Sequence, residues 1–188
     1  LSDLGRSDIY STSLVNIGDR LNTKDYLGDL LKKLSLYTSE MHERFFNLYC
    51  KLDYNMSLEL TVVKVLEKLQ SMSISLGVLT NGVVAAQKNK VKCLSLKKYV
   101  DHISYARERG KFFEKPHSLA FRDICEKLCC NLQNALFVGD HPINDIKGAK
   151  DAGMKTCWIR SPFFLKSDYA DFTIDNFDEL LTKIFNGD

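Results

Sequence analysis

Residues 136–149 read Leu-Phe-Val-Gly-Asp-His-Pro-Ile-Asn-Asp-Ile-Lys-Gly-Ala. A short apolar run ends in Gly139 and Asp140, and Asp145 then lies at the start of a segment with helical spacing that stops at Gly153. This order predicts a buried β-strand followed directly by a helix. Ligands of open α/β sheets bind at the carboxyl ends of the strands, so Asp140 and Asp145 are the first candidate site residues.

The same alternation of strand and helix continues along most of the chain. Strands are predicted at residues 74–79, 102–105, 135–138, 155–159 and 172–174, and helices at 60–69, 85–93, 117–128, 144–152 and 178–184. Short connections between these elements predict an α/β fold with a mostly parallel sheet and right-handed crossovers. Residues 24–52 show helical spacing alone, which predicts a small segment of two helices. A weaker strand candidate covers residues 13–18.

The composition is that of an ordinary globular domain, with 188 residues of which 45% are hydrophobic. The formal charge of +2 does not indicate a strongly basic surface of the kind that binds nucleic acid. No apolar run approaches the roughly 20 residues that a membrane-spanning helix needs, so we expect neither nucleic acid nor membrane as a partner. The six cysteines do not indicate a disulfide framework, and Cys125, Cys129 and Cys130 are interpreted as reduced thiols rather than zinc ligands. We therefore expect a reducing, cytoplasmic compartment.

Further polar groups adjoin the predicted strands. Thr80-Asn81-Gly82 follows the strand at 74–79, and Lys115-Pro116 precedes the helix that leads into the strand at 135–138. A threonine hydroxyl and free backbone N–H groups can donate to phosphoryl oxygens, lysine neutralises phosphoryl charge, and paired carboxylates suit Mg²⁺. Together these groups suit phosphoryl transfer, which depends mostly on positioning and charge neutralisation. Each alone also suits a turn, a helix cap or a solvated surface.

These stretches resemble three motifs of the haloacid dehalogenase-like (HAD) hydrolase superfamily, specifically of its phosphatases with a helical cap after the first strand. Residues 76–82 are similar to the second motif, residues 115–121 to the third and residues 136–149 to the fourth. The resemblance covers about residues 60–188. It implies a Rossmann-like, three-layer α/β core with a parallel sheet and a small helical cap.

The resemblance also implies a role for each matching residue. Thr80 would hydrogen-bond the transferring phosphoryl group, and Asn81-Gly82 would help to bind it. Lys115 would bind substrate and stabilise the charge of the nucleophile and of the phosphoryl group. Asp140 would be a ligand of a Mg²⁺ cofactor, and Asp145 would support the metal or orient Lys115.

The first motif of the family, a hydrophobic strand that ends in DxDx(T/V), is not intact in this chain. Its first aspartate is the nucleophile and its second is the general acid–base. Asp19-Arg20-Leu21-Asn22-Thr23 has the spacing and follows the candidate strand at 13–18, so Asp19 is the preferred nucleophile, although Leu21 occupies the acid–base position. Asp8-Ile9-Tyr10-Ser11-Thr12 also has the spacing, but a poor strand precedes it.

The resemblance predicts a Mg²⁺-dependent phosphatase that acts on a small phosphorylated metabolite through an aspartyl-phosphate. The core would comprise residues 1–23 and 57–188, the cap residues 24–56, and residues 13–18 would form the central strand. Because Leu21 cannot transfer a proton, we expect negligible turnover from this polypeptide alone. Three alternatives stay open: the chain is part of a longer phosphatase whose first motif lies upstream, it is a working enzyme with an atypical acid–base, or it is a catalytically inactive binding or regulatory module. A dehalogenase is less favoured, and the substrate and the oligomeric state stay open.

Overall fold

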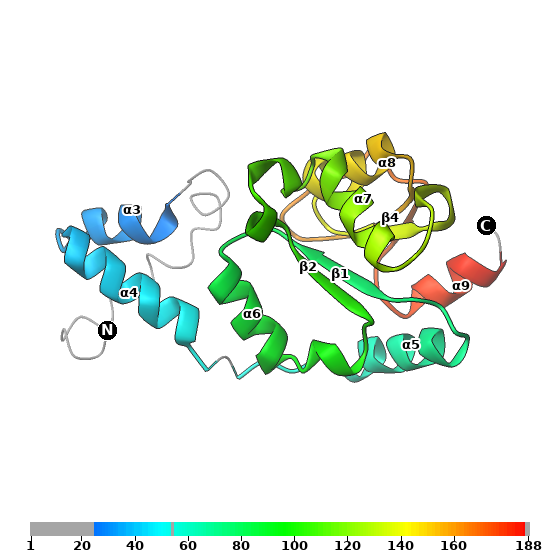
Figure 1. Cartoon of the computed structure of the whole chain (residues 1–188), viewed down its shortest axis with the longest axis horizontal. Helices are drawn as coiled ribbons and strands as arrows, with labels where there is room; N and C mark the ends of the chain where they lie inside the picture. Colours follow the sequence, from blue (N-terminus) through cyan, green and yellow to red (C-terminus); the bar gives the residue numbers. More distant parts are fainter. Residues whose placement is uncertain (1–24, 54, 187–188) are drawn as a thin grey trace. The chain divides into compact units, whose positions relative to one another are not determined.

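A computed structural model describes residues 25–53 and 55–186 of the chain (Figure 1). Its helices are α3 (Tyr26–Lys33), α4 (Ser39–Lys51), α5 (Leu60–Ser71), α6 (Val84–Cys93), α7 (Ser118–Lys127), α8 (Gly148–Ala152) and α9 (Glu179–Asn186). Its strands are β1 (Gly77–Thr80), β2 (His102–Tyr105), β3 (Leu136–Gly139), β4 (Lys155–Ile159) and β5 (Phe172–Ile174). The shorter turns are η2 (Leu96–Lys98), η3 (Ala106–Arg109), η4 (Lys111–Phe113), η5 (Leu132–Asn134) and the π-helical η6 (Pro142–Lys147). Within these ranges the predicted order of strands and helices is confirmed.

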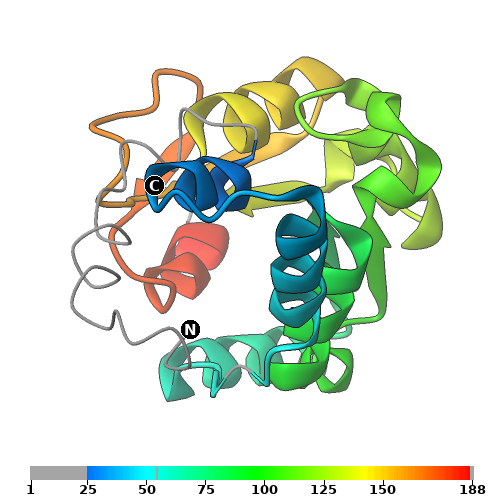
Figure 2. The same ribbon diagram turned by 90° about the vertical axis from the view of Figure 1, so that its left-hand side faces the viewer.

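The chain divides into two compact units, with the boundary after Leu52. The first unit contains the two predicted helices α3 and α4, which residues 34–38 connect (Figure 2). Side-chain oxygens of Asp25 and Thr38 accept hydrogen bonds from the first turns of α3 and α4 and so cap both helices. That residues 24–56 form a cap and residues 1–23 join the core stays a prediction, because residues 1–24 lie outside the described part.

The strands of the second unit form two parallel sheets. β1 pairs with β2 from Gly77↔His102 to Thr80↔Tyr105, and the other sheet has the order β3-β4-β5. All these pairings are parallel, which confirms the predicted α/β fold. In the part of the chain that the structure describes, β1 and β3 each have one partner strand. Residues 13–18, which the family resemblance predicts as the central strand, lie outside that part.

Helices cover both faces of the strands and give the three layers that the resemblance implies. On one face, α7 and α8 pack on β1 and β3 in a cluster that includes Leu79, Phe121, Ile124 and Ala149. On the other face, α5 and α9 pack on β3, β4 and β5 in a second cluster; its buried members are Val65, Leu69, Cys157, Ile174 and Leu180. Along β3 the side chains alternate, because Phe137 joins the first cluster whereas its two neighbours join the second.

Two predicted elements begin two or more residues away from their predicted start. β1 starts at Gly77 rather than at residue 74, because Leu76 uses its backbone N–H to bind the Asp101 carboxylate at 2.8 Å instead of a strand partner. The helix predicted from residue 144 starts two residues earlier as η6. His141 is the cause, since its Nδ1 accepts hydrogen bonds from the first two free backbone N–H groups of this turn.

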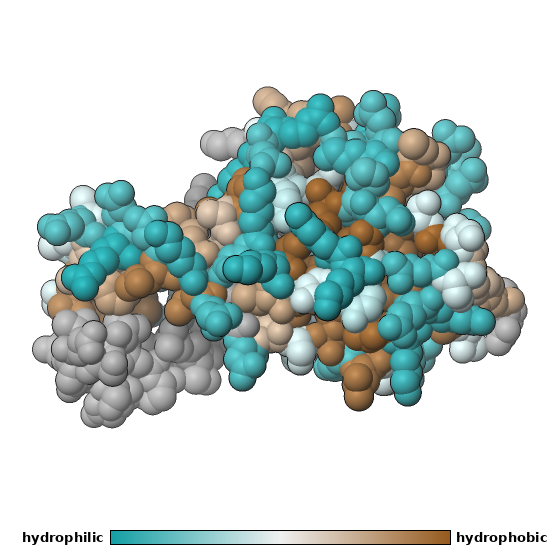
Figure 3. Space-filling view, turned by 60° about the horizontal axis from the view of Figure 1, so that its bottom comes forward, coloured by the Kyte–Doolittle hydropathy of each residue, from teal (hydrophilic) through white to brown (hydrophobic). Residues whose placement is uncertain are grey.

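The described surface mixes polar and apolar side chains, as the balanced composition predicts. Figure 3 shows one face of the molecule, on which hydrophilic and hydrophobic residues are interspersed. Among the helices that the structure describes, none has the length and apolar character needed to cross a membrane.

Candidate active site

Lys115 and Asp145 form the central ion pair of the candidate site. Lys115 Nζ lies 2.6 Å from Asp145 Oδ1, and their side chains are only 12% and 9% exposed. The other carboxylate oxygen, Oδ2, accepts a hydrogen bond from the backbone N–H of His141 at 3.1 Å. Both oxygens of Asp145 therefore have donors, and the ammonium group of Lys115 is held in one position. A buried charge pair needs this full set of partners to be stable.

Two glycines let the elements of the site approach one another closely. A Cβ atom on Gly139, the last residue of β3, would lie 2.5 Å from Cβ of Asp145. A Cβ atom on Gly148 would lie 2.8 Å from the backbone of Pro116, the residue after Lys115. The absence of these two side chains thus allows the Lys115 loop and the Asp145 turn to meet.

We expect Gly148→Ala to destabilise the protein by about 1–3 kcal/mol, as overpacking does. Alanine normally stabilises a helical position by about 1 kcal/mol relative to glycine, and Gly148 has helical angles, so the clash with Pro116 reverses the usual sign. Chemical denaturation measures the change. An unchanged or higher free energy of unfolding in the variant would show that the loop is free to move away.

Asn81 joins the end of β1 to the loop that carries Lys115. Its Nδ2 donates to the backbone carbonyl of Lys115 at 2.8 Å, and its Oδ1 accepts from the backbone N–H of Lys115 at 2.9 Å. This two-point contact spans 34 positions of sequence. The Asn81 side chain thus fixes the Lys115 backbone to the end of β1.

Thr80 and Gly82 lie on either side of this contact. The Thr80 hydroxyl is within hydrogen-bond distance of Gln87 Oε1 on α6, at 3.0 Å, and of the Asn81 carbonyl, at 3.2 Å. Gly82 lies in the turn between β1 and α6. The hydroxyl can exchange its present acceptors for a phosphoryl oxygen by rotation, because it is half-buried rather than enclosed.

Asp140 is the exposed acid of the site. It follows β3 directly, and none of the other described residues hydrogen-bonds or pairs with its carboxylate. Its backbone carbonyl is bound, however, because Nε1 of Trp158 on β4 donates to it at 2.7 Å. Among the described residues, no three His, Cys, Asp or Glu side chains gather as a metal site. Asp140 therefore offers a free carboxylate, which other oxygen ligands must complement to hold a cation.

A buried polar network supports α7, the helix that begins three residues after Lys115. Asp123 on α7 accepts hydrogen bonds at 2.8 Å from Ser104 on β2 and from Lys127, and it also pairs with Arg109. Burial, and next the charge of Arg109, lower the pKa of Lys127. The network fastens α7 to β2, so that the start of α7 and the Lys115 loop before it have a fixed support.

Two of the six cysteines, Cys125 and Cys157, are buried in the core. Burial raises the pKa of the Cys125 thiol to about 12, with a further contribution from Cys130 beside it. Burial likewise raises the pKa of Cys157 to about 12. Thiols with such values are not nucleophiles near neutral pH.

The structure brings together most of the residues that the sequence assigned to the site. Thr80, Asn81, Gly82, Lys115, Asp140 and Asp145 all lie at the carboxyl ends of β1 and β3 or in the loop bound to them. Asp19, the predicted nucleophile, lies outside the described residues, as does the alternative Asp8. Sequence reasoning missed Trp158, His141 and Gly148 as parts of the site. A signal existed for His141 and Gly148, which lie in the quoted stretch 136–149, but none for Trp158.

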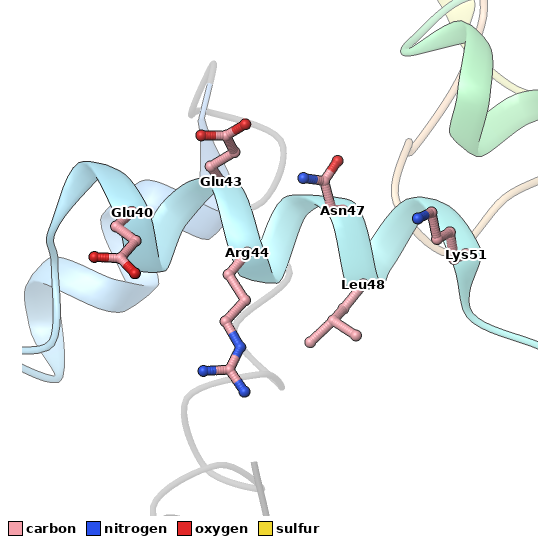
Figure 4. A pocket seen from close by; sticks show the side chains of 6 residues that line it. All are labelled: Glu40, Glu43, Arg44, Asn47, Leu48 and Lys51. Carbon is pink, nitrogen blue, oxygen red and sulfur yellow. The ribbon is translucent and has the colours of Figure 1, made fainter.

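A hollow also lies along α4, in the first unit (Figure 4). Six side chains line it: Glu40, Glu43, Arg44, Asn47, Leu48 and Lys51. Arg44 and Leu48 project to the same side of the helix, while both acidic and basic groups surround them. The hollow contains no residue that the motifs single out, so we assign it no role in the site.

Comparison with known proteins agrees with the motifs. A family model described as haloacid dehalogenase-like hydrolase matches residues 11–159. A glyceraldehyde 3-phosphate phosphatase of Pyrococcus abyssi is 34% identical over 97 residues, which are 52% of this chain and 40% of that protein. A phosphatase of the same name from Methanocaldococcus jannaschii is 30% identical over 127 residues, or 66% of this chain and 55% of that protein. The chain thus spans about half the length of the curated relatives it matches.

Solved structures with the same fold include phosphatases and dehalogenases. A HAD phosphatase from Thermococcus onnurineus has a TM-score of 0.62 at 23% identity and covers 85% of this chain and 88% of its own. An L-2-haloacid dehalogenase has a TM-score of 0.68 at 22% identity, with 85% and 69% covered. At these identities the comparison concerns the fold alone.

Proposed function

Because the chain belongs to the haloacid dehalogenase-like hydrolases, we propose that it binds a small phosphorylated metabolite and hydrolyses its phosphate ester. The reaction site is the rim at the carboxyl ends of β1 and β3. The observation that carries this proposal is the buried Lys115–Asp145 pair at 2.6 Å, which Asn81 fixes to the end of β1. A lysine held in this way provides a positive charge of defined position for phosphoryl oxygens.

Each residue of the rim has a chemical task in this proposal. Lys115 binds the phosphoryl group and neutralises the charge that builds up during transfer. The Thr80 hydroxyl and the backbone N–H groups of Asn81 and Gly82 donate to the same oxygens. Of the two tasks that the sequence left open for Asp145, orienting Lys115 suits the contacts, because donors already occupy both of its oxygens.

Mg²⁺ is the proposed cofactor. The exposed and unpaired carboxylate of Asp140 suits this ion, which prefers oxygen ligands and keeps several waters. When bound, Mg²⁺ supplies positive charge that offsets the charge of the phosphoryl group.

Asp19 is the proposed nucleophile, which would form an aspartyl-phosphate that water then hydrolyses. Leu21 stands where the family has its general acid–base, and an alkyl side chain cannot protonate a leaving group. This residue favours a second candidate function, a HAD-like module that binds phosphorylated ligands without turning them over. The two functions share the binding site and differ in the fate of the ester.

We infer the substrate class from the phosphate-binding groups of the rim and from the names of the relatives. Their names include glyceraldehyde 3-phosphate phosphatase, ribulose-1,5-bisphosphate 5-phosphatase and N-acylneuraminate-9-phosphatase. All three names describe phosphate esters of small sugar-like molecules, and we propose this class for the present chain. We also propose a reducing compartment such as the cytoplasm, since the six cysteines are free.

The metal site gives a direct test of the proposal. With inorganic phosphate present, we expect Mg²⁺ to stabilise the protein by about 2.7 kcal/mol at a concentration 100 times the Kd. Asp140→Ala should abolish this stabilisation because it removes the free carboxylate. Thermal unfolding against Mg²⁺ concentration measures both effects.

Asp168→Ala is the matched control, since Asp168 is an exposed aspartate whose partner, Lys166, is exposed as well. It should leave the Mg²⁺ response unchanged. A wild-type protein whose stability is indifferent to Mg²⁺ and phosphate would contradict the proposed function. Phosphate release from glyceraldehyde 3-phosphate then separates the phosphatase from the binding module.

A further inference from the structure

Trp158 is the only tryptophan of the chain; it is the fourth of the five residues of β4 and is 2% exposed. In the sheet it stands opposite Gly139, the last residue of β3, so its indole lies beside the loop that leaves that strand. The indole Nε1 donates to the backbone carbonyl of Asp140 at 2.7 Å. A buried indole N–H needs an acceptor, and here the acceptor belongs to the exposed acid of the candidate site.

The peptide unit between Asp140 and His141 is held at both ends. Its carbonyl accepts from Trp158, and its N–H donates to Oδ2 of Asp145 at 3.1 Å. Since a peptide unit is planar, fixing its two polar ends fixes the rotation of the whole plane. The plane in turn determines the direction in which the Asp140 side chain leaves the backbone.

The same peptide unit connects to Lys115. Asp145 receives the His141 N–H on one oxygen and the Lys115 ammonium on the other, at 2.6 Å. A rotation of the peptide plane would withdraw one donor from Asp145 and loosen its hold on Lys115. The orientation of the two acids and of the lysine therefore depends on one indole hydrogen bond.

We propose that Trp158 is a positioning residue that orients Asp140 and Asp145 through the peptide unit between Asp140 and His141. The part of this inference that concerns Mg²⁺ rests on the proposed function, whereas the part that concerns the peptide unit does not. Packing alone would require an aromatic ring at this place but no N–H donor. The contribution of the hydrogen bond can be separated from that of ring packing, because the N–H donor can be removed while the ring is kept.

The experiment compares three full-length variants with the wild type. Trp158→Phe removes the donor and keeps an aromatic ring. Incorporation of 3-benzothienylalanine at position 158 replaces only the indole N–H by sulfur. Cys157→Ala is the matched control, because Cys157 is a fully buried neighbour on β4 whose side chain packs in the opposite cluster with Val65 and Leu69.

The first readout is hydrogen exchange of the His141 amide by NMR, without metal. We expect exchange to become at least tenfold faster in both Trp158 variants, relative to the Cys157→Ala control at matched stability. Equal exchange in the benzothienyl variant and the wild type would overturn the inference, and so would an equal acceleration in the control.

The second readout is the Kd for Mg²⁺ with inorganic phosphate, measured by calorimetry. We expect it to rise about tenfold in the Trp158 variants and to stay unchanged in the control. Wild-type affinity in the benzothienyl variant would contradict the role toward the metal. If the wild type itself binds no Mg²⁺, the proposed function fails, and the exchange experiment still decides the role of Trp158.

Discussion

Leu21→Asp is expected to raise the rate of phosphate-ester hydrolysis by at least about 10²-fold, the lower end of what a general acid–base contributes. Leu21 stands two residues after Asp19, where the family pattern has its second aspartate. An aspartate there can protonate the leaving group and then activate the water that attacks the aspartyl-phosphate. Phosphate release from glyceraldehyde 3-phosphate with Mg²⁺ measures the gain.

Two controls make this result specific. Leu165→Asp places the same substitution at a fully exposed leucine, and it should not change the rate. Asp19→Asn combined with Leu21→Asp should abolish the gain, because the nucleophile is then absent. If Leu21→Asp alone has no effect while Mg²⁺ and phosphate still bind, then Asp19 is not the nucleophile. The alternative in which the functional first motif lies upstream of Leu1 is then favoured.

Lys115→Met is expected to destabilise the protein by about 3–5 kcal/mol and to abolish phosphate binding. The side chain of Asp145 is 9% exposed, so loss of the ammonium group at 2.6 Å leaves a buried carboxylate without its counter-charge. Breaking a buried pair from one side has a cost of this size, because the desolvation of the remaining charge is no longer offset. Urea denaturation gives the free energy of unfolding, and calorimetry with inorganic phosphate gives the binding.

The double variant Lys115→Met with Asp145→Asn tests the electrostatic origin of the effect. It should recover a large part of the stability, because no unpaired charge remains, but it should not recover phosphate binding. Lys88→Met is the matched control: Lys88 lies 2.7 Å from Glu108, yet both side chains are about half exposed. Its removal should hardly change the denaturation midpoint, since exposed pairs contribute little. Equal losses in Lys88→Met and Lys115→Met would contradict the argument from burial.

Most of the fold could be predicted from local pattern. The apolar run before Asp140 and the helical spacing after it are patterns of residues that lie close together in the sequence. Such patterns are enough to predict the strands and helices in the order in which the structure has them. The predicted start of β1 is three residues early, since Leu76 is apolar but its backbone N–H donates to the Asp101 carboxylate rather than to a strand partner. The candidate site followed from one rule, that the carboxyl ends of parallel strands lie at one edge.

The sequence by itself determined which polar groups reach that edge, because the alternation of strand and helix depends on spacing along the chain. Only the tertiary structure decided how those groups are paired. The contacts of Asn81 with Lys115 and of Trp158 with Asp140 span 34 and 18 positions of sequence. Contacts of this kind depend on how closely the packed layers approach one another. The absence of a side chain at Gly139 and Gly148 permits this approach, but the local sequence does not show which residue each glycine faces.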